Sequence, residues 1–421
     1  MMEVTSSFPY FSLVPHCLRW SWLGGKRIFK LLIQPNNTSR DLAPDVLRGF
    51  ALLGILLVNI PFMALSSEEG VRGEWVNGGA NSIATFLMVT LFQGKFYLLF
   101  SFLYGYSSQY IVKGEKVNRR RWLKRCLALM LIGAFHFTFF WHGDILFGYG
   151  FLGLFLTFFL FRSDRALKIW SIVLYSFFVL LLLTVATLTI VAEQRDPSQF
   201  AIIDSKMDQL MLGGSYFDTL APRAELWALG FFGSGLLLQG GFAFVAFILG
   251  IKAAKNHALR LDSTYFNPRL LMKFGFVIGL PIQLTLAGLY LWNEMQSQPS
   301  EAMYLAIIVF SFMAAPILTS GYIGAVIRIL QIRPVVLERI KYAGKMSLTT
   351  YLTQSIIMTL IFGNWGLGLF QKLDFWIVFL IAILIWLLQI RFAEFWITRY
   401  QQGPLERLMS KLTRIKKFSE Y

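Results

Sequence analysis

Long apolar stretches separated by short polar loops occupy most of the chain after residue 45. Most of them reach or exceed the roughly 18 to 20 residues that an α-helix needs to cross a bilayer. The pattern therefore predicts an all-α polytopic membrane protein with about ten transmembrane helices. The predicted spans are residues 46–65, 82–112, 122–141, 144–161, 168–191, 226–251, 270–292, 302–327, 346–363 and 375–392.

The second apolar run, 82–112, is too long for one ordinary span. It is interrupted by the polar sequence Gln93-Gly94-Lys95. We expect the first third of this run to tilt, to kink at the break, or to lie at the membrane interface.

Basic residues are distributed unevenly between alternate loops. With the N-terminus in the cytoplasm, the inner segments hold 33 of the 39 lysines and arginines and the outer segments hold 6. This asymmetry follows the positive-inside rule, so both termini are predicted to be cytoplasmic. One span more or fewer would place the basic loop around Arg119-Arg120-Arg121 on the outside.

Composition agrees with a chain whose main partner is the lipid bilayer. Hydrophobic residues make up 56% of it and charged residues 15%, against about 25% charged residues in a typical soluble domain. The net charge of +16 lies in short loops between spans, which does not favour nucleic-acid binding. Cys17 and Cys126 have no partner at metal or redox spacing, and no nucleotide-binding motif or soluble domain is present.

The predicted organisation has five segments. They are a basic cytoplasmic N-terminal segment (1–44), the first half of the bundle (45–191), an outer loop (192–225), the second half of the bundle (226–396) and a basic cytoplasmic tail (397–421). Residues 22–33 of the first segment suit a basic interfacial helix, or are upstream sequence from an early start codon. In the outer loop Phe200, Ile203, Met207 and Leu210 recur at helical spacing, which predicts a short amphipathic helix, either a connector or a lid.

Ionisable side chains within apolar spans are candidates for a functional site because burying them in lipid is costly. The stretch FHFTFFWHGDILFGYG places His136 near the outer end of the third span and Asp144 in the turn that follows. A carboxylate that orients a histidine suits acid–base chemistry or proton transfer, although His136 also suits simple helix packing. We expect Lys95 to lie at a similar depth, either as a neighbour of His136 and Asp144 or with its side chain reaching towards water. We expect His142 to be an exposed residue at the membrane interface.

Other candidates lie along the first span and at the cytoplasmic ends of later spans. Asp45 and Arg48 can pair at i and i+3, with Asn59 further along the same stripe. The start of the ninth span suits an anion through Lys345 and Ser347, with Gln354 two turns further in. Ordinary capping, anchoring and helix packing explain the same residues. No spacing typical of a metal site occurs, so no metal is expected.

Five stretches in collinear order resemble the YeiB-like family of bacterial inner-membrane proteins, whose C-terminal half is a domain of unknown function. They are DVLRGFALLGILLVNI, FQGKFYLLFSFLYGYS, FHFTFFWHGDILFGYGFLGL, GKMSLTTYLTQSIIMTLIFGNWGLGLF and FAEFWITRYQQGPLERL. The resemblance carries over Arg48, Gly94, Lys95, His136, Gly143, Asp144, Gly344, Ser347, Gln354, Gly403, Pro404 and Glu406. The chain departs from the family pattern at His142, where the family tends to have a small or acidic residue, and at Arg407, where it usually has tryptophan.

The family is more distantly similar to a transmembrane acyltransferase superfamily that includes heparan-glucosaminide acetyltransferase. That similarity implies cytoplasmic acyl-CoA as co-substrate, with no bound cofactor, and an acceptor acylated on the outer side by means of a histidine. In this hypothesis His136 is the base and Asp144 orients it. Lys95 or Asn59 stabilises the oxyanion, while Arg48, Lys345 and Ser347 bind CoA phosphates. The alternative hypothesis is a transporter for a small solute, with the same residues along its path.

Overall fold

The computed structural model describes residues 41–196 and 205–414. The interfacial helix expected at 22–33, and Phe200 and Ile203 of the amphipathic stretch, lie outside these residues. The described chain contains helices and no strand. Its main helices are α2 (Leu42–Asn59), α3 (Pro61–Ala64), α4 (Gly79–Leu87), α5 (Lys95–Val112), α6 (Arg119–Phe139), α7 (Leu146–Leu156), α8 (Asp164–Arg195), α9 (Lys206–Gly213), α10 (Leu220–Gly230), α11 (Gly241–Lys255), α12 (Pro268–Phe274), α13 (Leu280–Glu294), α14 (Glu301–Ile332), α15 (Pro334–Leu337), α16 (Ile340–Lys345), α17 (Ser347–Phe362), α18 (Phe375–Tyr400) and α19 (Pro404–Leu412).

Eight helical segments of the described chain are long and apolar enough to cross a membrane. They coincide with eight of the predicted spans. The fourth and ninth predicted spans instead contain the shorter apolar helices α7 and α17, of 11 and 16 residues. The protein is therefore an all-α polytopic membrane protein, as predicted. Ten crossings and cytoplasmic termini stay predictions.

Three of the long segments are interrupted by π-helical turns. These are η2 (Met88–Phe92), η6 (Phe231–Gly240) and η7 (Gly275–Gly279). After η2 the chain turns at Gly94, whose φ of 81° lies in the left-handed region that glycine adopts without strain. The helix α5 then begins at Lys95, so the break lies where the polar sequence predicts it. The first long helix, α2, begins at Leu42. Its first residues therefore belong to the segment 1–44 that is expected to be cytoplasmic.

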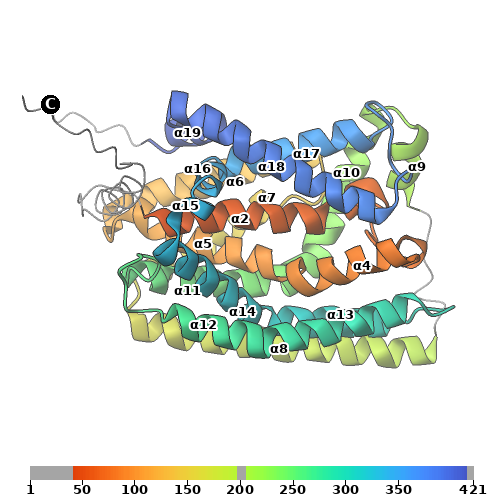
Figure 1. Ribbon diagram of the computed structural model, residues 1–421, viewed down its shortest axis with the longest axis horizontal. Helices are drawn as coiled ribbons and strands as arrows, with labels where there is room; N and C mark the ends of the chain where they lie inside the picture. Colours follow the sequence, from red (N-terminus) through yellow and green to blue (C-terminus); the bar gives the residue numbers. More distant parts are fainter. Residues whose placement is uncertain (1–40, 197–204, 415–421) are drawn as a thin grey trace, which may run out of the picture. The chain divides into compact units, whose positions relative to one another are not determined.

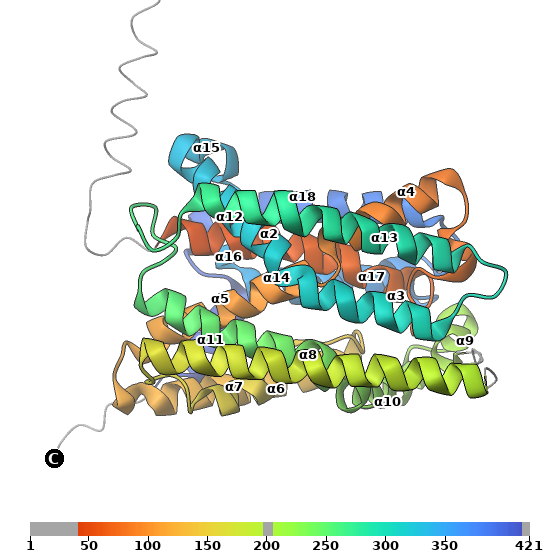
Figure 2. The same ribbon diagram turned by 90° about the horizontal axis from the view of Figure 1, so that it is seen from below.

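The helices of residues 42–414 run roughly alongside one another (Figure 1). Helices α8, α12 and α13 lie on one side of α2, and α17, α18 and α19 lie on the other. The view from below shows α11 packed between α5 and α8 (Figure 2), in agreement with their contacts. Glycines allow the closest of these approaches: a Cβ atom on Gly105 of α5 would lie 2.0 Å from the carbonyl oxygen of Phe247 on α11. Small residues serve the same purpose in other membrane helix pairs.

The loops that the charge pattern assigns to the outside contact one another. We call the end of the bundle where these loops lie the outer end. Arg72 contacts Glu294 at 3.2 Å and Glu301 at 2.6 Å. Asp208 of α9 accepts a hydrogen bond from the backbone of Ser67. At the opposite, inner end the loop after α11 is joined to the start of α8. The amphipathic stretch of the outer loop is helical from residue 206, and its Met207 is buried.

Candidate functional site

A histidine and an aspartate pair where helices α6 and α7 meet. His136 lies in the last turn of α6, and Asp144 lies in the loop that leads into α7. The Nδ1 atom of His136 is 2.8 Å from Oδ2 of Asp144, and both side chains are 0% exposed. The structure thus brings together the two residues that the sequence suggests as a catalytic pair.

A glycine of α6 allows the two helices to come close together beside this turn. The carbonyl oxygen of His136 accepts both N–H groups that follow α6, and the chain then reverses into α7. A Cβ atom on Gly133 would lie 2.4 Å from the backbone nitrogen of Phe147 and 2.6 Å from Oδ1 of Asp144. These distances are far below van der Waals contact, so only glycine allows α7 to approach α6 this closely.

Asp144 determines which nitrogen of His136 is basic. Its Oδ1 accepts the backbone N–H of Phe147 at 2.8 Å, and Oδ2 faces the imidazole. An ionised carboxylate can only accept, so Nδ1 donates and Nε2 carries the lone pair. Nε2 is buried and has no hydrogen-bond partner among the described residues. One nitrogen is therefore held in place, while the other has no partner in the described part of the chain.

Tyr351 from α17 lies against the same imidazole. The ring centroids of Tyr351 and His136 are 5.4 Å apart. The Tyr351 hydroxyl accepts the backbone N–H of Ile145 at 3.3 Å, which leaves its own proton for another acceptor. Sequence reasoning misses this residue, since an ordinary position within an apolar helix gives no signal of a contact across 206 positions of the chain.

Lys95 and Asn59, the two residues suggested for oxyanion stabilisation, have other surroundings. Lys95 is 0% exposed at the start of α5 and donates to the carbonyl oxygen of Val89 at 2.8 Å. Asn59 is partly buried near the end of α2. Within the described chain, no hydrogen bond or ion pair joins either side chain to His136 or Asp144.

Two of the inner candidates bind other parts of the bundle. Arg48 forms the expected pair with Asp45, at 2.7 Å, and also donates to the Ser107 hydroxyl on α5. Gln354 of α17 donates to Gln389 of α18 at 3.0 Å. Both arrangements connect helices, as polar side chains within membranes commonly do.

The N-terminus of α17 is filled by a carboxylate of the chain itself. Oε1 of Glu406 accepts the backbone N–H groups of Leu348 and Thr349 at 2.8 and 3.1 Å. Oε2 accepts the Thr349 hydroxyl at 2.7 Å, and the N-cap position is occupied by Met346, whose side chain makes no capping hydrogen bond. Since helix N-termini attract anions, Glu406 occupies the position suggested for an external anion beside Lys345 and Ser347.

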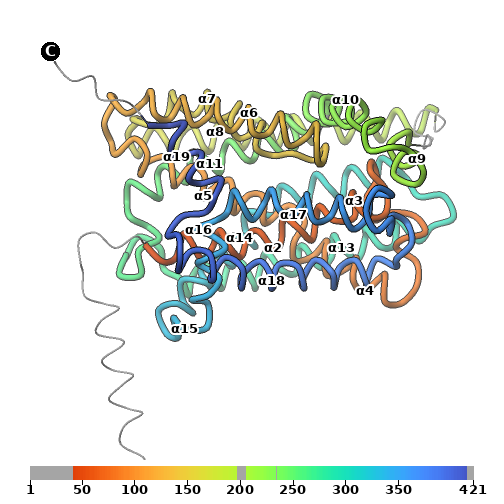
Figure 3. Tube along the Cα trace, turned by 90° about the horizontal axis from the view of Figure 1, so that it is seen from above, coloured from red at the N-terminus to blue at the C-terminus, as the bar shows by residue number. Residues whose placement is uncertain are grey.

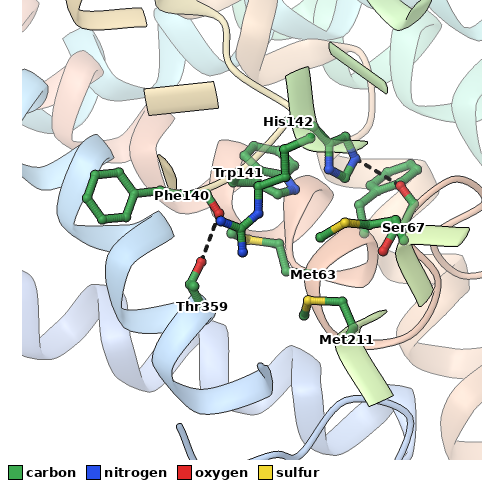
Figure 4. A pocket seen from close by; sticks show the side chains of 10 residues that line it. Met63, Ser67, Phe140, Trp141, His142, Met211 and Thr359 are labelled. Carbon is green, nitrogen blue, oxygen red and sulfur yellow. Dashed lines mark hydrogen bonds between the residues drawn. The ribbon is translucent and has the colours of Figure 1, made fainter. Parts of the chain in front are cut away.

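A second group of polar side chains lines a small hollow at the outer end (Figure 4), with a volume of about 20 Å³. Its polar lining comprises Ser67, Trp141, His142, Arg223 and Thr359. His142, expected to be exposed, is partly buried, and its Nε2 lies 2.9 Å from the carbonyl oxygen of Ser67. The sequence gives little signal of this hollow, because it forms between loops that are distant in the chain. The described residues contain no cluster of metal-ligating side chains.

Similarity to known proteins extends over most of the chain. It is 31% identical over 399 residues to "Uncharacterized protein YeiB" of Escherichia coli (strain K12), which covers 89% of this chain and 96% of the relative. It is 29% identical over 409 residues to "Uncharacterized protein YxaH" of Bacillus subtilis (strain 168), which covers 90% and 96%. Residues 253–416 match the family model described as "Protein of unknown function (DUF418)". No solved structure matches.

Proposed function

The chain belongs to the YeiB-like family, and we propose that it is an acyltransferase of the bacterial cytoplasmic membrane. Its acceptor would be an envelope lipid, a glycan or a small molecule. The observation that carries this proposal is the buried pair of His136 and Asp144, whose Nε2 has no partner in the described chain. A histidine held in this way is equipped to act as a general base.

The proposed reaction transfers an acyl group from acyl-CoA to a hydroxyl or amino group. Nε2 of His136 removes the acceptor's proton while the acceptor oxygen or nitrogen attacks the thioester carbonyl. The tetrahedral intermediate then collapses, the C–S bond breaks, and the proton passes from Nε2 to the CoA sulfur. Asp144 keeps the ring in the required tautomer and stabilises the imidazolium.

Tyr351 is the better candidate for oxyanion stabilisation than Lys95 or Asn59. In its bond with the backbone N–H of Ile145 the hydroxyl oxygen accepts, so the hydroxyl proton is still free to be donated to an oxyanion. It lies beside the imidazole, whereas Lys95 is engaged at the break before α5. A donor aimed at the developing oxyanion is often the largest single contribution to acyl transfer.

Arg48 and Lys345 at the inner end are proposed to bind the phosphates of acyl-CoA. Arg48 retains 14% side-chain exposure within its pair with Asp45. We leave Ser347 out of this role because Glu406 fills the adjacent helix N-terminus and would repel a phosphate. Acyl-CoA would be a co-substrate, and no further cofactor is needed for this reaction.

The test is CoA release from radiolabelled acyl-CoA by the purified protein in liposomes, with extracts of envelope lipids and glycans as acceptors. His136→Gln, Asp144→Asn and Tyr351→Phe should reduce the rate, the first by at least about 100-fold. The matched control is His257→Asn, at an exposed loop position with a φ of 48° that asparagine tolerates. Undiminished transfer by His136→Gln would disprove the proposed base.

Solute transport remains the second candidate because of the broken span around Lys95. The π-helical η2, the turn at Gly94 and a fully buried lysine resemble the interrupted helices at the binding sites of many transporters. Uptake that is lost in Lys95→Met and retained in His136→Gln, with no acyl transfer in either, would favour transport.

A further inference from the structure

The hollow at the outer end contains a buried arginine without a carboxylate partner in the described chain. Arg223 is 1% exposed. Its Nη1 donates to the carbonyl oxygen of Phe139 at 3.0 Å, and the rings of Tyr216 and Trp365 lie 5.1 and 5.2 Å from its guanidinium carbon. Capping the end of α6 and a hydrogen bond with the Tyr216 side chain account for two of the five N–H donors of the guanidinium. A buried cation is normally matched by an anion, so a guanidinium without a carboxylate beside it suggests a ligand.

Two neighbouring residues of the lining also have buried nitrogens without partners in the described chain, Nε1 of Trp141 and Nδ1 of His142. A carbonyl oxygen can only accept, so Nε2 of His142 carries the proton shared with Ser67. Burial lowers the pKa of His142 to about 4, opposed by the Ser67 carbonyl and reinforced by Arg223. At neutral pH Nδ1 is therefore an acceptor. The carboxylate of Asp208 on α9 is bound to the backbone N–H of Ser67.

Together these groups suit a ligand that has both an anionic oxygen and an O–H group. Arg223 and the Trp141 N–H can donate to oxygens, while Nδ1 of His142 needs a donor. A phosphate group that retains one proton offers both, whereas sulfate and phosphate diesters have no O–H at neutral pH. The volume of about 20 Å³ has room for about one oxygen atom of such a group, and Met63 and Met211 belong to the flexible apolar part of the lining (Figure 4).

We infer that the hollow binds a singly protonated phosphate group, either inorganic phosphate or the head of a phosphate monoester. Arg223 supplies the charge, Trp141 a second donor, and His142 the acceptor that selects for the proton. The hollow shares the turn between α6 and α7 with the His136 pair, but the inference does not depend on His136 acting as a base.

Calorimetric titration of the purified full chain with inorganic phosphate at pH 7 tests the inference. We expect binding of phosphate and at least about tenfold weaker binding of sulfate, since an acceptor left facing an oxygen of sulfate repels it. Mixed micelles containing phosphatidic acid, a monoester, or phosphatidylmethanol, a diester without any hydroxyl group in its head, distinguish the source. Binding of phosphatidic acid but not phosphatidylmethanol indicates a lipid ligand, and binding of inorganic phosphate alone indicates free phosphate. Failure of both phosphate and phosphatidic acid to bind, or equal binding of sulfate, would overturn the inference.

Two tryptophan variants show whether binding depends on an N–H group of the hollow or on any buried tryptophan N–H group. Trp141→Phe removes one donor with little change in shape and should weaken binding of the phosphate probe by about tenfold. Trp227→Phe removes another buried, unpartnered N–H outside the lining, where the ring stacks on Phe137 and Phe231, and should leave binding unchanged. Arg223→Gln should abolish binding, but it also uncaps α6, so the tryptophan pair decides if that variant does not fold. Equal effects of the two tryptophan variants would contradict the proposed site.

Discussion

An alanine in place of Gly133 tests whether the close approach of α6 and α7 holds the histidine–carboxylate pair together. The added methyl group would lie 2.4 Å from the backbone nitrogen of Phe147 and 2.6 Å from Oδ1 of Asp144, so the two helices must move apart. Overpacking of this kind costs about 1 to 3 kcal/mol. Alanine gains about 1 kcal/mol over glycine within a helix. We therefore expect a net loss of about 0 to 2 kcal/mol in the free energy of unfolding, with Asp144 displaced from His136.

Nitrogen NMR of histidine-labelled protein measures the displacement directly. In the wild type, His136 should be protonated at Nδ1 alone, because Asp144 accepts that proton. In Gly133→Ala both neutral tautomers should be populated, and thermal unfolding should begin at a lower temperature. The matched control is Gly213→Ala at the end of α9, where nothing lies within 4 Å of an added Cβ. If Gly133→Ala matched this control in both the spectrum and thermal stability, the steric reasoning would be wrong.

Three further predictions concern charges outside this pair. Glu406→Gln should lower the free energy of unfolding by about 1 to 2 kcal/mol, measured by thermal unfolding, because the cap of α17 loses its charge. Arg72→Met should lower the free energy of unfolding by about 3 to 5 kcal/mol, because it leaves Glu294, whose side chain is 1% exposed, without its cationic partner. In the same assay the exposed Arg260→Met should cost less than about 1 kcal/mol. Burial raises the pKa of Glu69 above its usual 4.5, so the folded state binds this proton more tightly and the contribution of Glu69 to stability falls as pH rises. Glu69→Gln should therefore stabilise at pH 7 with little effect near pH 4, and melting temperatures across this range would show it.

The sequence predicts the helical spans well because each depends on local hydropathy. The break at Gly94 is equally local, since a glycine between polar residues cannot continue an apolar helix without cost. The shortness of α7 is different, because its 11 residues follow an apolar run that continues beyond its end. Where that run stops being helical depends on the packing of α6 and α8 around it.

The pairing of His136 with Asp144 is predictable because only one tight turn separates them. The surroundings of Lys95 cannot be predicted in the same way, because the depth of a residue along a span does not tell on which side of the helix it lies. Tyr351 and Glu406 reach their partners only after distant helices have packed. His142 departs from the usual family residue, which suggested a minor role, yet it lines the hollow.

The outer end of the protein folds over α6 because that helix ends inside the bundle. Helices α10 and α9 lie beyond the end of α6 (Figure 3). Backbone carbonyls that are buried away from water need hydrogen-bond donors. The carbonyl oxygen of Phe139 accepts from both Tyr216 and Arg223, and that of Phe140 accepts from Thr359. The same donors that complete this helix end place a cation beside the turn of His136. The proposed base and the proposed anion site can therefore arise from one structural requirement. Variants of Arg223 should affect the melting temperature and phosphate binding together, whereas Trp141→Phe should affect binding alone.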